Sequence, residues 1–393
     1  MGVPEPPPFS EQVLDRVFDF SLGTRIVFGP DRIDELGSLA REHASQRVLV
    51  VSDPGVVAAG HTERGCASLR AAGFDVTLFA EARENPTTDD VARGLEVARA
   101  LQPDLLVGLG GGSSMDCAKG INFLYTNGGR MQDYWGVNKA TQPMLPMIAV
   151  PTTAGTGSEL QSFALISDAE THVKMACGDR KATCRVALLD PKLTVTQPPR
   201  VTALTAVDAV SHVVETYVTR KRNPMSMAFS WRAWALLTAH LPRVFGDPTD
   251  LTSRGGVQLG ASLAGLAIEN SMLGIAHSLA NPLTATYDIP HGQAVSVMLP
   301  WVVRFNAKVA GQSYEELSAV LPHDEGRDGA ERLASWLEQL LERAGLETKL
   351  SALGVDSSRF AELAEAAEQQ WTRGFNPRSS TREELFHLYQ QAF

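Results

Sequence analysis

The chain has 393 residues, which is more than one compact domain usually holds and predicts two domains. Hydrophobic residues make up 44% of the sequence and charged residues 20%, proportions typical of a globular protein with enough apolar mass for two cores. The net charge of −10, without an extended basic cluster, disfavours nucleic-acid binding because an acidic surface repels phosphate backbones. No apolar run approaches the roughly 20 residues of a membrane helix, so no membrane partner is expected.

The cysteine content and the N-terminal stretch predict a cytoplasmic protein. The four cysteines form no CxxC pair, are too few for a disulfide framework and exclude a four-cysteine zinc site. The proline-rich start of the chain lacks the basic and apolar regions of a secretory signal. We therefore expect reduced thiols in a reducing compartment.

The first half of the sequence alternates short valine-rich runs with helical patterns such as residues 89–101. Strands are predicted at residues 47–53, 74–80, 104–109 and 147–150. Strands separated by helices of this length indicate βαβ units and a parallel sheet. A strand-rich patch then closes this half, with runs at residues 162–167, 171–177 and 186–189.

The character of the sequence changes at Pro198-Pro199, a pair that stops any regular element. We place the domain boundary here, between residues 1–198 and residues 199–393. Beyond it the pattern is nearly all helical, with helices predicted at residues 202–219, 224–241, 251–276, 329–344 and 381–393. The chain is thus predicted to be an α/β nucleotide-type domain followed by an all-α domain, and a cleft between two such domains is a favoured place for a ligand.

A glycine-rich run, GLGGGSSMD at residues 108–116, follows one predicted strand and opens a predicted helix. Glycines let the backbone approach a pyrophosphate closely, and the helix N-terminus offers free N–H donors to it. A tight strand-to-helix turn also needs glycine, but four glycines in five positions favour phosphate binding. Asp116, in the first helical turn, is a candidate cofactor residue and equally a candidate helix cap.

Two further features are consistent with a dinucleotide. The run PTTAGTGSE at residues 151–159 follows another strand, and is either a polar surface loop or a second wall of the cofactor site with hydroxyl donors. Asp53 ends the first of the predicted strands, where an acidic side chain binds a ribose 2′-hydroxyl and disfavours a 2′-phosphate. An aspartate that starts a turn before Pro54-Gly55 is the alternative interpretation.

The helical half carries a set of metal-ligating residue types. Asp208 and His212 are four residues apart, so both side chains project from one helix face, as in a helix salt bridge or a chelating pair. His277 ends an apolar helical run, and His291 stands between proline and glycine, a position typical of a loop. Such histidines are commonly packing or loop residues. Together, however, the four side chains suit a mixed nitrogen and oxygen site for Fe(II), Zn(II) or Mn(II).

Taken together, these motifs resemble the iron-containing (group III) alcohol dehydrogenases from about residue 23 to the end of the chain. The matching signatures are GGGSSMD at 110–116, PTTAGTGSE at 151–159, DAVSH at 208–212 and GIAH…PHG at 274–292. The order and spacing of the four are more specific than any one of them. The resemblance implies a Rossmann-like dinucleotide-binding domain and an all-α metal-binding domain, an architecture shared with dehydroquinate synthase.

The resemblance also implies which residues hold the metal and the cofactor. It makes Asp208, His212, His277 and His291 the metal ligands. Around NAD, with NADP disfavoured, it places Asp53, Asn85, Gly111, Gly112, Ser113, Thr152, Thr153, Thr156 and Lys174. Two positions depart from the pattern: Gln161 stands where a small hydroxyl residue is expected, and Asn281 stands where many relatives carry a histidine proposed for the proton path. An asparagine does not titrate, so no imidazole relay operates there.

The expected activity is reversible hydride transfer between a small alcohol and NAD, giving an aldehyde or ketone, by a homodimer or larger homo-oligomer. The metal acts as a Lewis acid and the cofactor carries the hydride. Two alternatives share this fold: a lyase of the dehydroquinate synthase type, and a hydroxyacid–oxoacid transhydrogenase in which NAD stays bound. The metal-site segments are poor in the Lys and Arg that an anionic phosphate substrate of such a lyase requires.

Overall fold

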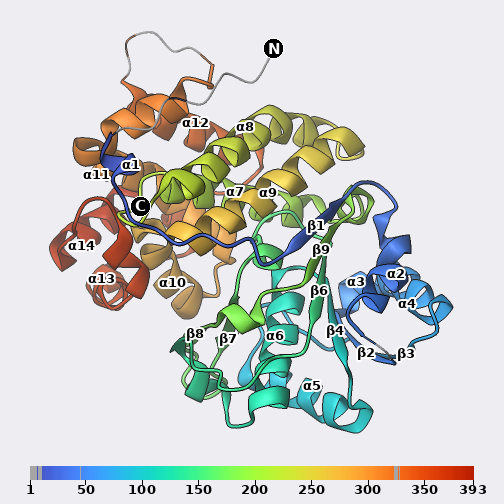
Figure 1. Cartoon of the computed structure of the whole chain (residues 1–393). Coiled ribbons are helices and arrows are strands. Elements are labelled where there is room, and N and C mark those ends of the chain that lie inside the picture. Colours follow the sequence, from blue (N-terminus) through green and yellow to red (C-terminus); the bar gives the residue numbers. More distant parts are fainter. Residues whose placement is uncertain (1–6, 8–10, 45, 323–325, 327) are drawn as a thin grey trace. The chain divides into compact units, whose positions relative to one another are not determined.

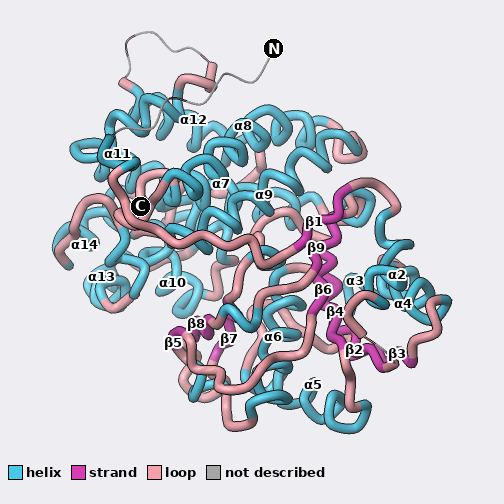
Figure 2. The backbone as a smooth tube through the Cα atoms, viewed as in Figure 1, coloured by secondary structure: helices cyan, strands magenta, loops and turns pink. Residues whose placement is uncertain are grey.

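The computed structural model describes residues 7, 11–44, 46–322, 326 and 328–393. The chain forms two compact units: one is Ser21–Gln197, and the other joins Met1–Phe20 to Pro198–Phe393. The first unit contains the sheets and the second is helical (Figures 1 and 2). The segment before Ser21 therefore groups with the helical unit, whereas the sequence assigned it to the α/β domain.

A six-stranded parallel sheet is the centre of the first unit, in the order β1-β9-β6-β4-β2-β3. The strands are β1 (Arg25–Phe28), β2 (Arg47–Val51), β3 (Asp75–Phe79), β4 (Leu105–Gly110), β6 (Met147–Pro151) and β9 (Val186–Leu189). The chain adds β3 outside β2 and then returns to place β4 on the other side of β2. The direction of winding therefore reverses between β2 and β4, and the carboxyl ends of the strands at such a reversal are the usual ligand site of an open parallel sheet.

Alternating side chains of the central strands enter two separate cores, as the period of two along a strand requires. Leu49 and Val51 of β2 pack in one core with α5 (Thr88–Leu101) and α6 (Gly112–Asn127). Val48 and Val50 pack in the other with α2 (Leu36–Arg41) and α4 (His61–Ala71). A strand buried on both faces reads as a continuous apolar run, which is why β2 and β4 were recognisable from sequence.

A small second sheet, β5-β8-β7, completes this unit. It comprises β5 (Gly136–Val137), β7 (Phe163–Ser167) and β8 (Lys174–Gly178), with β7 and β8 antiparallel. The strand-rich patch expected at residues 162–189 therefore divides, because β9 joins the large sheet and not this one. Short helical elements connect the strands: α3 (Pro54–Ala58) follows β2, and η3 (Ser158–Leu160) ends the threonine-rich loop after β6.

The second unit contains the long helices α7 (Pro199–Thr216), α8 (Pro224–Gly246), α9 (Leu251–Ser271) and α11 (His291–Ser318). Shorter helices are α1 (Glu11–Leu14), α10 (Ile275–Tyr287), α12 (Gly329–Arg343), α13 (Phe360–Glu368) and α14 (Arg382–Gln391). Local sequence explains their starts: Asn223 caps α8 through the N–H groups of Met225 and Ser226, and Pro224 occupies the first helical position. Thr381 and Glu384 form a capping box at α14.

Two helix predictions near the histidines are corrected by the structure. The single helix expected over residues 251–276 is two helices, because Met272 adopts a φ of 65° and ends α9. His277 is consequently the third residue of α10, and not the end of a run. His291, expected in a loop, is the first residue of α11, with Pro290 as its N-cap. Among the described helices none alone is long and apolar enough to cross a membrane; α9 and α10 meet that test only as a pair bent by 106°.

Candidate metal centre and cofactor site

Asp208 and His212 lie one turn apart on α7 and face the same side of that helix. The distance from His212 Nε2 to Asp208 Oδ1 is 3.3 Å. Both residues are buried, in a helix whose stretch from Ala206 to Thr216 is buried throughout. A polar pair in such a helix is not a solvated salt bridge, which was the alternative that spacing alone left open.

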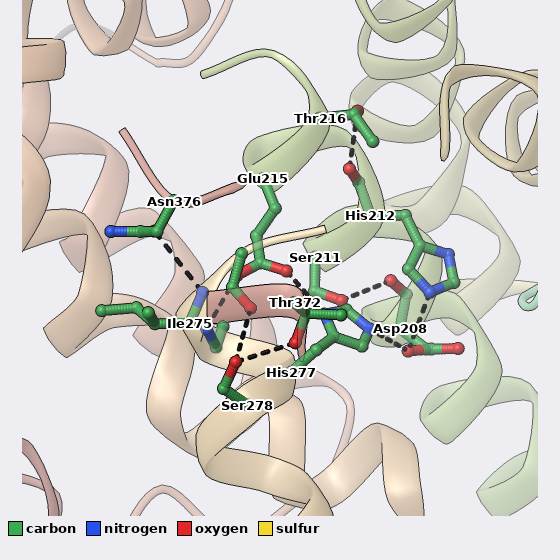
Figure 3. Close-up of polar contacts among 12 residues, drawn as sticks. Asp208, Ser211, His212, Glu215, Thr216, Ile275, His277, Ser278, Thr372 and Asn376 are labelled. Carbon is green, nitrogen blue, oxygen red and sulfur yellow. Dashed lines mark hydrogen bonds and ion pairs between the residues drawn. The ribbon is translucent and has the colours of Figure 1, made fainter. Parts of the chain in front are cut away.

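His277 and His291 come from the starts of two other helices and reach the same carboxylate. His277 Nε2 is 3.8 Å and His291 Nε2 is 3.9 Å from Asp208 Oδ1. Each of Asp208, His277 and His291 offers a ligand atom within 4.8 Å of the others. The His277 ring is 5.2 Å from that of His212 and 5.3 Å from that of His291, centroid to centroid. The three histidines predicted as ligands therefore meet around one oxygen of the fourth, Asp208. Figure 3 shows Asp208, His212 and His277.

For both Asp208 and His277, burial and the neighbouring charges act on the pKa in opposite directions, and the charges have the larger effect. Burial raises the pKa of the Asp208 carboxyl, but the neighbouring imidazoles, His212 foremost, outweigh it and hold that pKa well below its usual range. Burial lowers the pKa of His277, yet Glu215 and Asp208 together raise it to about 9. A cation bound among these side chains would compete with a proton for the imidazole nitrogens beside Asp208, which would link metal binding to pH.

The donor set fits a divalent transition-metal ion. Asp208 Oδ1 and His277 Nε2 are buried atoms that have no hydrogen-bond partner among the described residues. Leaving a buried polar atom unpaired costs about 1–3 kcal/mol, so such atoms facing one another indicate a missing partner. A carboxylate oxygen together with imidazole nitrogens is a set that Fe(II), Zn(II) and Mn(II) accept.

Glu215 is a member of this cluster that the sequence analysis missed. It lies on α7, one turn beyond His212 and two turns beyond Asp208, and is 3% exposed. Its Oε2 is 2.6 Å from His277 Nδ1, and its Oε1 accepts the backbone N–H of Ala276 at 2.7 Å (Figure 3). The spacing i, i+7 from Asp208 was the available signal, since it places both carboxylates on one face of the helix.

Asn281, the departure from the family pattern, lies one turn after His277 on α10. Its amide donates to Gln370 Oε1 at 2.9 Å. Gln370 precedes η8 (Trp371–Phe375), so this pair joins α10 to the segment ahead of α14. The site where many relatives carry a histidine is therefore occupied by the hydrogen-bonded amides of Asn281 and Gln370, neither of which titrates.

The glycine-rich loop and Asp53 meet at the reversal point of the large sheet. Gly111 is the N-cap of α6, directly after β4, and Asp53 follows the neighbouring β2. Asp53 Oδ1 accepts the N–H groups of Gly55 and Val56 at 3.0 and 3.1 Å, so it does cap α3. Its Oδ2 accepts the Ser114 hydroxyl at 2.9 Å, which ties the carboxylate to the start of α6. Asp53 therefore does start the turn before α3, and it also lies beside the glycine loop.

The threonine-rich loop packs directly on the glycine loop. Thr152 donates its N–H to Gly110 O at 2.9 Å, and a Cβ on Gly111 would lie 3.4 Å from Thr153 Cγ2. A Cβ on Gly112 would lie 2.6 Å from Thr156 Oγ1, so only glycine fits there. Gln161 Nε2 donates to Thr156 O at 2.7 Å, and thus holds the loop backbone from behind.

Asn85, Ser113 and Lys174 form a second small group in this unit. Asn85 has a φ of 50° and donates its N–H to Ser113 Oγ at 3.2 Å. Lys174, the first residue of β8, donates to Asn85 Oδ1 at 3.1 Å. Lys174 and Asn85, which are 89 positions apart in the sequence, are therefore both connected to Ser113 in the first turn of α6.

Asp116 does not cap α6. It is the fifth residue of the helix, is 8% exposed and accepts the Ser158 hydroxyl at 2.7 Å. Burial raises its pKa although the nearby Lys119 acts in the opposite direction. Lys119, which the sequence analysis missed, is fully buried and donates to four oxygens of residues 158–163. A lysine one turn after Asp116 was the signal, because an apolar helix face tolerates such a pair only when it is satisfied.

The fold and the two sites define a dinucleotide-linked, metal-dependent enzyme. The family model for iron-containing alcohol dehydrogenase matches residues 23–191, and the model for the C-terminal part of the Fe-containing alcohol dehydrogenase family matches residues 202–393. The chain therefore belongs to the iron-containing alcohol dehydrogenase family and is an NAD-linked alcohol dehydrogenase, as the motifs predicted.

Named relatives span nearly the whole chain. An NAD-dependent methanol dehydrogenase of Bacillus methanolicus is 32% identical over 95% of this chain and 99% of its own length. A 1,3-propanediol dehydrogenase of Klebsiella pneumoniae is 32% identical over 96% of this chain and 99% of its own length. Among solved structures, a 1,3-propanediol oxidoreductase has a TM-score of 0.93 at 32% identity, covering 96% of this chain and 100% of that one. The predicted fold class is confirmed.

Proposed function

We propose that Asp208, His212, His277 and His291 hold one divalent ion, Fe(II) first, with Zn(II) or Mn(II) as alternatives. The single observation that carries this assignment is the meeting of three helix segments on one oxygen of Asp208, with Asp208 Oδ1 and His277 Nε2 buried and without a hydrogen-bond partner among the described residues. The family's iron supports the choice of ion.

We further propose that NAD is bound by the residues at the reversal point of the sheet. The N–H groups of Gly111 and Gly112 at the start of α6 suit a pyrophosphate, because a helix N-terminus favours an anion. Asp53 lies beside them and favours a ribose 2′-hydroxyl over a 2′-phosphate. The remaining proposed contacts are Asn85, Ser113, Asp116, Thr152, Thr153, Thr156 and Lys174.

The reaction proposed is reversible oxidation of a short alcohol to an aldehyde or ketone. When bound, an ion held by Asp208, His212, His277 and His291 would supply Lewis acidity, and NAD held at the glycine loop would supply the hydride acceptor. The ionised Asp208 would offset part of the ion's charge, and the three histidines would offer ring nitrogens to it. Asn281, whose amide donates to Gln370, supplies no base, so the proton would have to leave by another route, with water or the cofactor ribose as candidates. Short alcohols are named for relatives that cover nearly the whole chain, which supports this substrate class.

A homodimer in the cytoplasm is the assembly and location we propose. All four cysteines are free and buried, in keeping with a reducing compartment. The dimer follows from the family resemblance and is tested by light scattering of the purified chain.

The test is NADH formation by chain stripped of metal and reloaded separately with Fe(II), Zn(II) or Mn(II). Primary alcohols, diols and hydroxy acids are compared, with NADP as a second cofactor. We expect NADH release that depends on the metal, and loss of at least a hundredfold in kcat/KM for His277→Ala. Tight NAD binding without NADH release under every metal would favour the transhydrogenase or the lyase instead.

A further inference from the structure

The carboxylate of Glu215 lies between two elements of the metal centre without facing the ligand atoms themselves. It is a residue of α7, like Asp208 and His212, but both of its oxygens are engaged at the start of α10 (Figure 3). Oε1 accepts the N–H of Ala276, and Oε2 is bonded to His277 Nδ1. A residue that touches a ligand and not the ion acts by positioning that ligand.

The chemistry of this contact determines which nitrogen of His277 carries the proton. An ionised carboxylate only accepts hydrogen bonds, so at 2.6 Å from Oε2 the Nδ1 atom must be the donor. A neutral imidazole has one N–H, which leaves the lone pair on Nε2. Nε2 is the atom that lies 3.8 Å from Asp208 Oδ1. We propose that Glu215 is a positioning residue of the metal centre, fixing His277 in the one tautomer and orientation that presents Nε2 as the ligand atom; this rests on the proposed metal site.

The local backbone is arranged to keep Glu215 in place. The N-cap of α10 is Gly274, which has no side chain to cap the helix. A Cβ at this position would lie 2.9 Å from Glu215 Oε1 and 2.9 Å from Asn376 Oδ1. These two side chains instead accept the N–H groups of Ala276 and Ile275, at 2.7 and 3.4 Å. Two residues from other segments therefore cap α10, and the glycine leaves room for both.

Asn376 is itself fixed, which makes this entry to α10 rigid. Its amide forms a reciprocal pair with Asn306 of α11, at 2.8 and 3.1 Å, and also donates to Arg378 O at 2.7 Å. His277 is the next residue after Ala276, so this capped turn fixes the direction of its Cα–Cβ bond, and the contact with Glu215 Oε2 orients the ring. A ligand on a rigid, capped turn needs no reorganisation when the ion arrives.

Capping and tautomer selection are separable by a single isosteric change. Glu215→Gln keeps the size and one oxygen of the side chain, so the Ala276 N–H keeps its acceptor. The amide NH₂ then faces His277 Nδ1 and donates to it, which moves the imidazole proton to Nε2 and removes the ligand lone pair. A residue that only capped α10 would tolerate this exchange.

The experiment uses the full chain stripped of metal, titrated with Zn(II) against a chromophoric chelator and, separately, with Co(II) for its visible absorption bands. We expect one Zn(II) per chain in the wild type and a 10- to 100-fold weaker affinity in Glu215→Gln. Because His277 is withdrawn, the Co(II) spectrum of Glu215→Gln should match that of His277→Ala. Thr216→Val is the matched control: it removes a buried hydroxyl bonded to the His212 carbonyl, one residue further on, and should keep wild-type affinity and spectrum.

The outcomes separate this inference from the proposed metal site. If His277→Ala abolishes tight binding while Glu215→Gln keeps the wild-type affinity or spectrum, the positioning role is overturned and the metal site stands. If His277→Ala binds like the wild type, the metal site itself is overturned and the inference with it. Glu215→Asp restores an acceptor and should recover the wild-type Co(II) spectrum with intermediate affinity. Should Glu215→Gln not fold by circular dichroism, a Glu215→Asp spectrum like that of His277→Ala would overturn the role.

Discussion

Lys119 and Ser158 are joined twice: the ammonium Nζ donates to the Ser158 carbonyl at 2.7 Å and to its hydroxyl at 3.0 Å. The same Nζ reaches the carbonyls of Gln161 and Phe163, and Ser158 donates onward to Asp116. One lysine on α6 thereby fastens the end of the threonine-rich loop to the helix that begins with the glycine loop. The two walls of the proposed cofactor site depend on this single fully buried cation.

Lys119→Met should destabilise the chain by about 3–5 kcal/mol, because it leaves buried acceptors and the Asp116 carboxylate without their cation. We also expect NAD to bind at least tenfold more weakly, since the loop is no longer held. Urea unfolding and cofactor fluorescence measure the two effects. Lys181→Met is the control: Lys181 bonds Ala140 O and Asp179 but is 42% exposed, and its loss should cost less than about 1 kcal/mol.

Gly112→Ala should weaken NAD binding and cost about 1–3 kcal/mol, because the new methyl group would overlap Thr156. Thr156→Ala removes the Oγ1 atom at 2.6 Å and the Cγ2 atom at 2.7 Å, so the double variant should regain much of the lost stability. A double-mutant cycle of unfolding free energies measures this coupling. Simple additivity of the two changes would contradict the contact.

Asp53→Asn should relax the preference for NAD over NADP. Asparagine keeps an oxygen for the N–H groups of Gly55 and Val56, so the α3 cap survives, but the negative charge that repels a 2′-phosphate is gone. We expect the ratio of kcat/KM for NADP to that for NAD to rise at least tenfold. An unchanged ratio, with normal thermal stability, would remove Asp53 from cofactor selection.

Asp168 should make stability depend on pH in the acid range. Its carboxylate accepts the N–H groups of Thr171 and Glu170, and Gln132 also donates to it; these bonds, that of Thr171 foremost, lower its pKa to about 2. Because the folded pKa is below the ordinary value of about 3.9, the ionised group stabilises the fold above that value, and the stabilisation is lost as pH falls toward 2.

Asp168→Asn tests this linkage. The wild type should exceed the variant in urea midpoint at pH 6, and the difference should shrink steadily below pH 4. Thermal unfolding at the same pH values gives an independent check. A difference that stays constant from pH 6 to pH 2.5 would mean that Asp168 contributes through geometry alone.

Much of the fold could be predicted from local pattern, and the failures share a physical cause. The apolar run of β2 was predicted at residues 47–53 and is Arg47–Val51, because a strand buried on both faces has a distinctive composition. The strand β1, with two exposed ends, lacks that composition and was missed. The break between α9 and α10 was missed because it depends on the backbone conformation of Met272, a residue with no propensity for positive φ.

The candidate site was predictable where residue type carries the chemistry. Histidine and aspartate in the helical half pointed to metal, and the structure brings the four together. Glu215 and Lys119 were not found because an acid or a lysine in a helix usually faces solvent, and only tertiary packing shows that both are buried. The role of Gln161 was likewise invisible, since it depends on a contact with the backbone of Thr156.

The grouping of the N-terminal segment with the helical unit has a consequence for how the chain is made. Phe20 packs its ring 5.6 Å from that of Phe229, so this residue belongs to the unit that resumes at Pro198, and residues 21–197 are inserted between the two parts of that unit. In a polypeptide leaving the ribosome, the inserted sheet unit emerges whole and can fold at once. The segment ahead of it has to wait for partners that are synthesised some two hundred residues later. We therefore expect the earliest part of the sequence to be among the last to find its native contacts.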